Sequence, residues 1–427
     1  MNARHASFKA QRRQHGAAAL IVTMLLFFAM VLVAVFVNRN LVFEQRSAAN
    51  QYRSTQAFEA AEAGLEWALA QLNNPQRVGA DCLPTADAAA TSFRTRFLSF
   101  TRSTATYGPA TWSRAGVPTP LQPSCVRTAA GWSCSCPAQG LPALTAPAGN
   151  AAAPAFALQF APTGKPGIVR VIATGCTSLA GACAPGSATN ADATAKVQVA
   201  LGLLPGVRTP PAATLTTRGA FDAGSAALGL HNPDPTTGIA LQAGGPINAS
   251  RARVTAPAGA PLAGALIGSD AALAASSTDR YFASYFGIDK AAWKNQAGVT
   301  RITCSGDCSS ALAAAIGAAA DTALVWVDGD LALRGALALG SAQRPVVIVV
   351  NGSVQLDGAV AVHGVLYGSA LSWNDTSGAA FLRGAAISET LYQGNGAPEL
   401  YYDTGVLATL KTQSGSFARV SGSWRDF

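Results

Sequence analysis

The chain has 427 residues, of which 49% are hydrophobic and only 12% are charged, with 42 glycines and 23 prolines. This length exceeds one comfortable hydrophobic core, so we expect more than one folding unit. The formal net charge is +8, yet the basic residues beyond the first sixteen are scattered singly and lack interleaved aromatic residues. Because a nucleic-acid surface needs clustered basic side chains, the composition argues against nucleic acid as a partner.

Residues 17–37 form an apolar run without a charge, a proline or a glycine. At ~1.5 Å per residue a helix of this length spans about 31 Å, enough to cross a hydrocarbon core. The preceding residues 1–16 are basic, which predicts a cytoplasmic N-terminus and an exported body. A secretory signal peptide is the alternative, but its apolar region would be shorter, at roughly 7–15 residues, and a cleavage site would follow it.

The helical pattern continues beyond the apolar run. Residues 39–72 contain one glycine and no proline and are rich in helix-forming residues, and Asn73-Asn74-Pro75 ends the pattern. We therefore predict one helix over residues 17–73, with a transmembrane half at 17–37. An apolar stripe at steps of three and four predicts that the second half packs on a domain; the stripe consists of Phe58, Ala61, Leu65, Ala68 and Leu72.

Three short stretches of this region have a recognisable order of residues. Residues 12–22 read Arg-Arg-Gln-His-Gly-Ala-Ala-Ala-Leu-Ile-Val, residues 44–50 read Glu-Gln-Arg-Ser-Ala-Ala-Asn, and residues 56–65 read Gln-Ala-Phe-Glu-Ala-Ala-Glu-Ala-Gly-Leu. Together they resemble the leader and N-terminal motif of PilX-type minor pilins of the type IV pilus, over roughly residues 12–72. The closing residues 422–427 are similar to tails in the same family.

The resemblance implies a processing site and a set of partners. Residues 1–16 would be a basic leader, and a prepilin peptidase would cut between Gly16 and Ala17 on the cytoplasmic side and leave a methylated N-terminus. The protein would first sit in the inner membrane as a single-pass protein with a periplasmic body. It would then enter the pilus on the cell surface beside other minor pilins and a tip adhesin, in a system for adhesion and twitching motility.

One position departs from the pattern of major pilins. Those proteins carry a glutamate at the fifth mature position, thought to pair with the amino group of a neighbouring subunit, whereas the fifth residue from Ala17 here is Ile21. Burying an unpaired ammonium is costly, but the topmost subunit need not supply a carboxylate for a subunit above it. The hypothesis is a minor pilin at or near the tip that helps prime assembly.

For the exported body we predict an α+β fold in two regions. Residues 74–211 are Pro- and Cys-rich, with a short helix or strand at Ser92–Phe100 and strands at Gly167–Thr174 and Ala195–Leu204. Residues 212–427 are β-rich, with a helical insertion at about 270–320. Short apolar runs spaced by glycines between Leu324 and Gly368 fit a stacked β-solenoid, and a meander of hairpins remains the alternative.

Eight cysteines in an exported chain favour structural disulfides over a zinc site. Cys176 with Cys183 and Cys304 with Cys308 would close short loops. The remaining four allow three pairings, and nothing in their spacing selects one; they are Cys82, Cys125, Cys134 and Cys136.

No catalytic, cofactor or metal motif emerges, so we expect a protein that is not an enzyme and needs no cofactor. Asp328 and Asp330 beside a tight turn are typical of turn chemistry rather than of calcium binding. A membrane-tethered β-helical protein that binds polysaccharide or another ligand is the second hypothesis. Catalysis on a sugar would need clustered carboxylates, whereas this region shows isolated ones; they include Asp357, Asp375 and Glu389.

Overall fold

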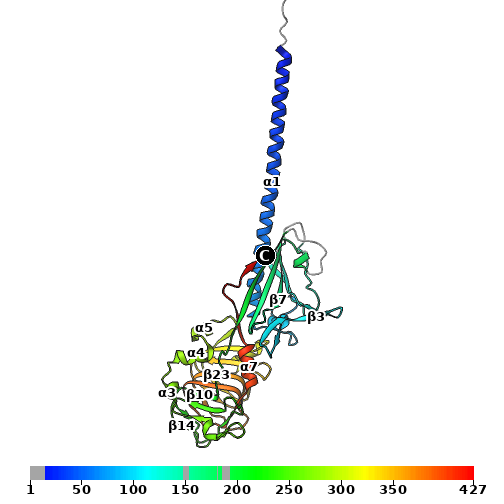
Figure 1. Cartoon of the computed structure of the whole chain (residues 1–427). Helices are drawn as coiled ribbons and strands as arrows, with labels where there is room; N and C mark the ends of the chain where they lie inside the picture. The colour runs from blue at the N-terminus through cyan, green and yellow to red at the C-terminus, as the bar shows by residue number, and fades with distance from the viewer. Residues whose placement is uncertain (1–14, 148–152, 180, 185–192) are drawn as a thin grey trace, which may run out of the picture. The chain divides into compact units, whose positions relative to one another are not determined.

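The computed structural model describes residues 15–147, 153–179, 181–184 and 193–427. It contains two compact units, Met1–Gln56 and Ala57–Phe427, and the second holds both the sheets and the disulfides. Figure 1 labels several of the elements, which are numbered in chain order. The predicted α+β class is confirmed: long and short helices accompany two separate sheets of many strands.

Helix α1 spans His15–Leu72, close to the predicted 17–73. Most of the predicted leader, residues 1–14, lies outside the described residues. The helix ends where expected, before Asn73-Asn74-Pro75. The Asn73 side chain then pairs with the backbone of Phe417, donating to its carbonyl at 3.0 Å and accepting from its N–H at 2.7 Å. The end of the helix is thereby tied to the last part of the chain.

An antiparallel sheet packs against the last turns of α1. Its strand order is β26-β9-β8-β7-β5-β6, with β27 also on β9. The strands are β5 (Ser124–Thr128), β6 (Gly131–Ser135), β7 (Ala155–Pro162), β8 (Ile168–Cys176), β9 (Thr194–Pro205), β26 (Gly415–Arg419) and β27 (Arg425–Asp426). The predicted stripe on α1 is buried against this sheet except at Phe58, which is partly buried. The two strands predicted at 167–174 and 195–204 correspond to β8 and β9.

Small elements close the remaining side of this core. The segment predicted as helix or strand at 92–100 contains both, because helix α2 (Phe93–Phe97) runs directly into strand β1 (Leu98–Thr101). Two hairpins are formed by β1 with β2 (Thr106–Pro109) and by β3 (Thr111–Arg114) with β4 (Val117–Pro120). Ser92 caps α2 by accepting from the Thr95 N–H, which explains where the helix starts.

Strands β9 and β26 are neighbours in this sheet, although nearly half of the chain lies between them. Pro205 pairs with Gly415 and Leu201 with Arg419. Residues 206–414, which we call the coil region, are therefore an insertion in one loop of the sheet. This corrects the predicted domain boundaries, 74–211 and 212–427: the last residues belong to the first sheet, because they complete its edge beside β9.

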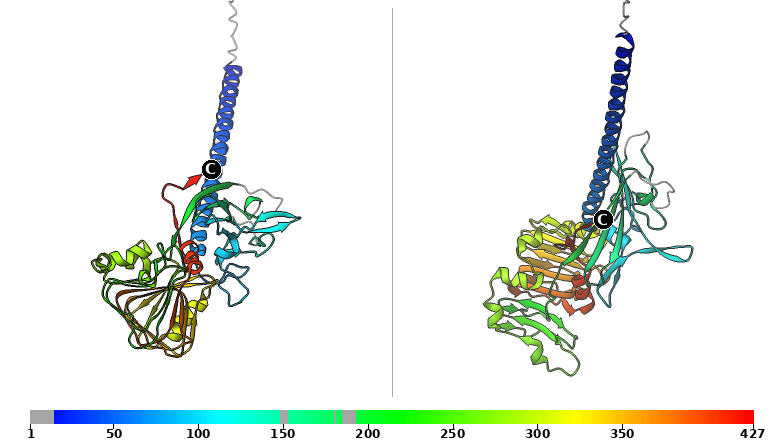
Figure 2. Two further views of the ribbon diagram at one scale, coloured as in Figure 1. Left: turned by 60° about the horizontal axis from the view of Figure 1, so that its bottom comes forward. Right: turned by 45° about the horizontal axis from the view of Figure 1, so that its top comes forward.

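All strand pairs of the coil region are parallel, in three stacks of neighbouring strands (Figure 2). Consecutive hairpins would pair antiparallel, so the parallel register fits stacked coils. Alternate residues face the interior, where Leu331, Leu333, Val354 and Leu356 are all buried. The strands are β10 (Ala213–Thr217), β11 (Phe221–Asp222), β12 (Gly229–His231), β13 (Ile239–Ala243), β14 (Ile247–Asn248), β15 (Arg253–Thr255), β16 (Leu266–Ile267), β17 (Val299–Thr303), β18 (Ala323–Asp328), β19 (Leu331–Arg334), β20 (Leu337–Leu339), β21 (Val346–Val350), β22 (Val354–Asp357), β23 (Val360–Trp373), β24 (Phe381–Gln393) and β25 (Glu399–Tyr402).

The chain does not wind through this stack from one end to the other. The neighbours in space run β17-β18-β21-β23-β24-β10-β13-β16. The chain therefore starts in the middle at β10, winds to one end at β16, and begins again at the opposite end with β17. It returns until β24 lies beside β10. This path brings both ends of the insertion to the middle of the stack, as two adjacent strands of the first sheet require.

Helices connect the two halves of the coil region. They are α3 (Ala271–Ala274), α4 (Thr278–Phe286) and α5 (Lys290–Lys294), and the short 3-10 helix η2 (Leu262–Ala265) precedes them. Helix α6 (Ser309–Ala318) lies between β17 and β18, and α7 (Thr404–Thr412) follows β25. They match the helical insertion predicted at about 270–320, although β17 interrupts it. One face of α4 is buried at Tyr281, Phe282 and Phe286, and Phe282 contacts Tyr367 of β23. These aromatic rings are core and not an exposed patch.

The structure joins all eight cysteines in disulfides, Cys82–Cys136, Cys125–Cys134, Cys176–Cys183 and Cys304–Cys308. The first bridge selects among the three pairings that the sequence left open. It closes a loop of 54 residues in the region that covers the end of α1, whereas Cys304–Cys308 spans only 4. The 3-10 helix η1 (Gly181–Cys183) carries one end of the third bridge.

We predict that the disulfides closing the longest and the shortest loop differ in their contribution to stability. Since loop-closure entropy grows with loop length, replacing Cys82 and Cys136 by alanine should cost about 4 kcal/mol, and replacing Cys304 and Cys308 about 2 kcal/mol. Urea unfolding of the full chain in detergent, followed by tryptophan fluorescence, measures both. Equal losses for the two double variants would contradict the prediction.

Candidate functional site

The first half of α1 presents an apolar surface that the chain itself does not cover. Its large hydrophobic side chains from Leu20 to Phe43 expose 41–73% of their area. The helix is long and apolar enough to cross a membrane, with a mean hydropathy of 3.1 over its best window and none of that window buried. Such a surface needs lipid or other helices around it. This half of α1 is therefore the first candidate site.

The predicted processing site lies at the start of this helix. Gly16 and Ala17 belong to the first turn of α1. The residue in the fifth position after Gly16 is Ile21, whose side chain is 58% exposed. A carboxylate is absent at that position, as the sequence already showed.

The second half of α1 lies unusually close to strand β8. A Cβ atom built on Gly175 would approach the Ala57 carbonyl oxygen and the Ala61 nitrogen closer than real Cβ atoms do, and one on Gly64 would lie 3.0 Å from the Phe156 ring. Only glycine and alanine at these points allow the helix backbone to touch the sheet. This contact fixes the end of the helix to the body.

The C-terminal tail also contacts this half of the helix. Arg419 forms an ion pair with Glu66, and the Trp424 ring meets Phe58 edge-to-face with centroids 6.3 Å apart. The pair is exposed and contributes little by itself. The tail nevertheless covers the edge of β9 and the helix at once, which gives the family-like closing residues a structural role.

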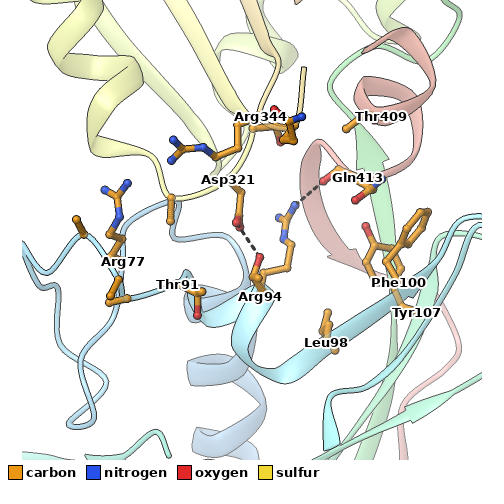
Figure 3. A pocket seen from close by; sticks show the side chains of 17 residues that line it. Arg77, Thr91, Arg94, Leu98, Phe100, Tyr107, Asp321, Arg344, Thr409 and Gln413 are labelled. Atoms are coloured by element: carbon orange, nitrogen blue, oxygen red, sulfur yellow. Dashed lines mark hydrogen bonds between the residues drawn. The ribbon is translucent and has the colours of Figure 1, made fainter. Parts of the chain in front are cut away.

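Arg94 of α2 connects three distant parts of the body (Figure 3). Its guanidinium donates to the carbonyl of Leu72 at 3.0 Å, of Gln413 at 3.2 Å and of Gly415 at 2.8 Å. Leu72 is the last residue of α1, Gln413 lies at the end of the coil region, and Gly415 begins strand β26. A cation at a helix C-terminus also interacts favourably with the helix dipole. Burial lowers the pKa of Arg94.

A cavity of about 510 Å³ opens beside Arg94, between the α2 segment and the coil region (Figure 3). Asp321 lies in it and accepts hydrogen bonds from the hydroxyls of Ser92 and of Thr95, the latter at 2.7 Å. Tyr107 donates to the Thr412 carbonyl, and burial raises its pKa to about 12, so it remains a neutral donor. Asp321 and Tyr107 thus form hydrogen bonds across the junction between the α2 segment and the coil region, and these bonds hold the two parts together.

The residues examined for chemistry in the coil region have separate partners. Asp328 accepts from Lys294 and Trp326, and these bonds lower its pKa, whereas Asp330 accepts from Ser353. His363 lies in the β23 ladder opposite Arg383. Among the described residues no group of three His, Cys, Asp or Glu side chains is placed to hold a metal ion.

The carboxylates that the sequence marked as isolated are held by neighbours of other kinds. Asp357 accepts from Asn374 at 3.0 Å, Asp375 from Ser377 at 2.7 Å, and the buried Glu389 from the Tyr367 hydroxyl at 2.6 Å and from Lys290. The sequence pattern does not reveal the contacts of Arg94 and Asp321 or the ion pair of Lys290 with Glu389. Their partners are distant along the chain, so no local pattern could have revealed them.

The chain combines a long apolar N-terminal helix with an antiparallel sheet that packs on the second half of this helix. Residues 15–66 match the family described as PilX N-terminal. The resemblance to PilX-type minor pilins that the sequence shows is confirmed over that segment.

Comparison with other known proteins adds little beyond that segment. No curated protein matches the chain. One solved structure that does is the crystal structure of competence-associated pilin ComZ from Thermus thermophilus, at 11% identity, covering 88% of this chain and 98% of that one, with a TM-score of 0.20. At this TM-score the likeness carries no argument about the coil region.

Proposed function

We propose that this protein is a PilX-type minor pilin that occupies the tip of a type IV pilus, or a position near it, and helps prime pilus assembly without enzymatic activity. The supporting observation is Ile21, which stands where a subunit of the shaft would supply a carboxylate to a neighbour's amino group. A subunit without another above it loses nothing by lacking that group, whereas an ammonium buried without a partner in the shaft would be costly.

The size of the coil region supports the same position. Residues 206–414 are inserted in one loop of the sheet that carries the helix. A subunit repeated through a shaft has to fit neighbours on all sides, and a large insertion makes that harder. At the tip the coil region is free to contact a tip adhesin or other minor pilins, which are the partners of this proposal.

The position in the fibre is tested by immunogold labelling of sheared pili with an antibody against the coil region. We expect label at fibre ends only, because a single priming complex starts each fibre. A major-pilin antibody on the same grid provides the control for even labelling. Label spread along the shaft would contradict the tip position.

Two further measurements test processing and the assembly role. Mass spectrometry of the mature protein should find a methylated Ala17 as the first residue. An intact Met1, or cleavage after the apolar run, would contradict insertion into a pilus. Deletion of the gene should reduce surface pili in cells with and without retraction, and normal piliation in both backgrounds would remove the priming role.

A further inference from the structure

A polar groove of about 540 Å³ crosses one outer face of the coil region. Four neighbouring strands line it, β22, β23, β24 and β11, and their register sets Gln355 beside Ser372 and Gln393 beside Asp222. Neighbouring strands lie ~4.8 Å apart, so the groove extends about 14 Å along the stack. It lies on a different face from helices α3–α5 and from the cavity beside Arg94.

Several polar side chains of the groove are held rigidly by the protein. The Asn395 side-chain oxygen accepts from the Ser225 N–H at 2.9 Å and from the Ala226 N–H at 3.2 Å. Asp222 Oδ1 accepts from the Gly224 N–H and from Asn248. Because these bonds fix the rotamers, the remaining polar atoms have defined positions before any ligand arrives.

Other polar atoms of the same side chains have no protein partner. Within the described part of the chain no hydrogen bond uses the Gln393 amide, Asp222 Oδ2, Asn395 Nδ2 or Gln355 Oε1. Gln355, Gln393 and Asn395 are exposed and Asp222 is partly buried, so a ligand in the groove could reach these atoms and replace water there. The NH2 groups of Gln393 and Asn395 offer donors to the groove, and the oxygens of Gln393, Asp222 and Gln355 offer acceptors.

The rest of the lining limits the chemistry of the ligand. Leu391, exposed at 38%, and Ala370 form an apolar patch between the polar groups. Asp222 is the single charged residue of the lining, so a polyanion would meet repulsion and no cation. A sugar ring has apolar C–H faces and hydroxyls that both donate and accept, which fits an apolar patch bordered by amides and one carboxylate.

We propose that this groove binds an extended neutral oligosaccharide, with Gln393 and Asp222 making the main polar contacts. The sugar chain would run along the stack, across several strands, because the free polar groups repeat in that direction. The proposal rests on the coil region and is independent of the position of the protein in a fibre.

The test is calorimetric titration of the full chain in a detergent without a sugar headgroup. The probes are neutral hexasaccharides: a β-1,4-glucan, an α-1,4-glucan, a β-1,4-xylan and a β-1,4-linked N-acetylglucosamine chain. We expect at least one to bind, and Gln393→Ala and Asp222→Asn each to weaken that binding about tenfold. Asp222→Asn keeps the oxygen that accepts from Gly224, so the loop should stay folded.

Two control variants distinguish a loss of binding at the groove from general effects of a substitution on the protein. Gln159→Ala removes an exposed glutamine from a strand of the other sheet, and Asp279→Asn neutralises an exposed aspartate on α4; both should bind as the parent does. The proposal is overturned if no hexasaccharide binds at millimolar concentration, or if binding is unchanged in both groove variants. Polygalacturonate or an unstructured peptide binding at the groove in place of the neutral sugars would also overturn it.

Discussion

Replacing Arg94 by alanine is expected to lower the free energy of unfolding of Ala57–Phe427 by about 3–5 kcal/mol. The guanidinium donates to carbonyls of Leu72, Gln413 and Gly415. It also lies over the Phe417 ring at 4.9 Å from the centroid. Without it the end of α1 and the end of the coil region would both keep carbonyl groups without donors, at the point where the insertion rejoins the sheet.

The measurement is urea unfolding of the full chain in detergent. Arg94→Lys tests geometry, because one ammonium keeps the charge but cannot donate in the same fork, and we expect an intermediate loss. Arg102→Ala removes an exposed arginine from the following turn and should change stability by less than about 0.5 kcal/mol. If Arg94→Ala resembles Arg102→Ala, the three-carbonyl contact does not stabilise the junction.

The second large effect is expected from Gly175→Ala, which adds one methyl group where β8 touches α1. The new Cβ would overlap backbone atoms of Ala57 and Ala61, which cannot rotate away as a side chain can. The helix would have to move off the sheet, exposing part of the core that includes Leu65 and Phe156. We expect a loss of about 3 kcal/mol or more, at the upper end of overpacking.

The matched control is Gly317→Ala in α6, where an added Cβ meets nothing within 4 Å. Since alanine favours helix over glycine by about 1 kcal/mol, this variant should be neutral or slightly more stable. Both substitutions are of the same kind, so the difference isolates the helix–sheet contact. Similar stability of the two variants would mean that α1 is not held at Gly175.

Some of the architecture could be predicted from neighbouring residues alone. The bounds of α1, the apolar stripe on its second half and the strands β8 and β9 all follow from local periodicity. The bridge between Cys82 and Cys136 and the contacts of Arg94 could not be predicted in this way. They join residues whose proximity depends on how the whole body folds.

The amino-acid sequence by itself determined the long N-terminal helix and its family resemblance. An apolar run of membrane length, a basic leader and the residue order up to position 66 are all local properties, and so is the presence of Ile21. These features act through helix formation and transfer into lipid, which need no distant partner.

Only the tertiary structure decided where the body divides. Strand β26 completes the sheet beside β9, and the coil region winds from its middle to one end and back from the other. Pairing between strands some two hundred residues apart leaves no mark on the local pattern, because each strand shows only which side is buried and not which strand lies next to it. The neighbour of a strand depends on which sheet edge is open in the folded chain and on the register that buries the apolar side chains of both strands.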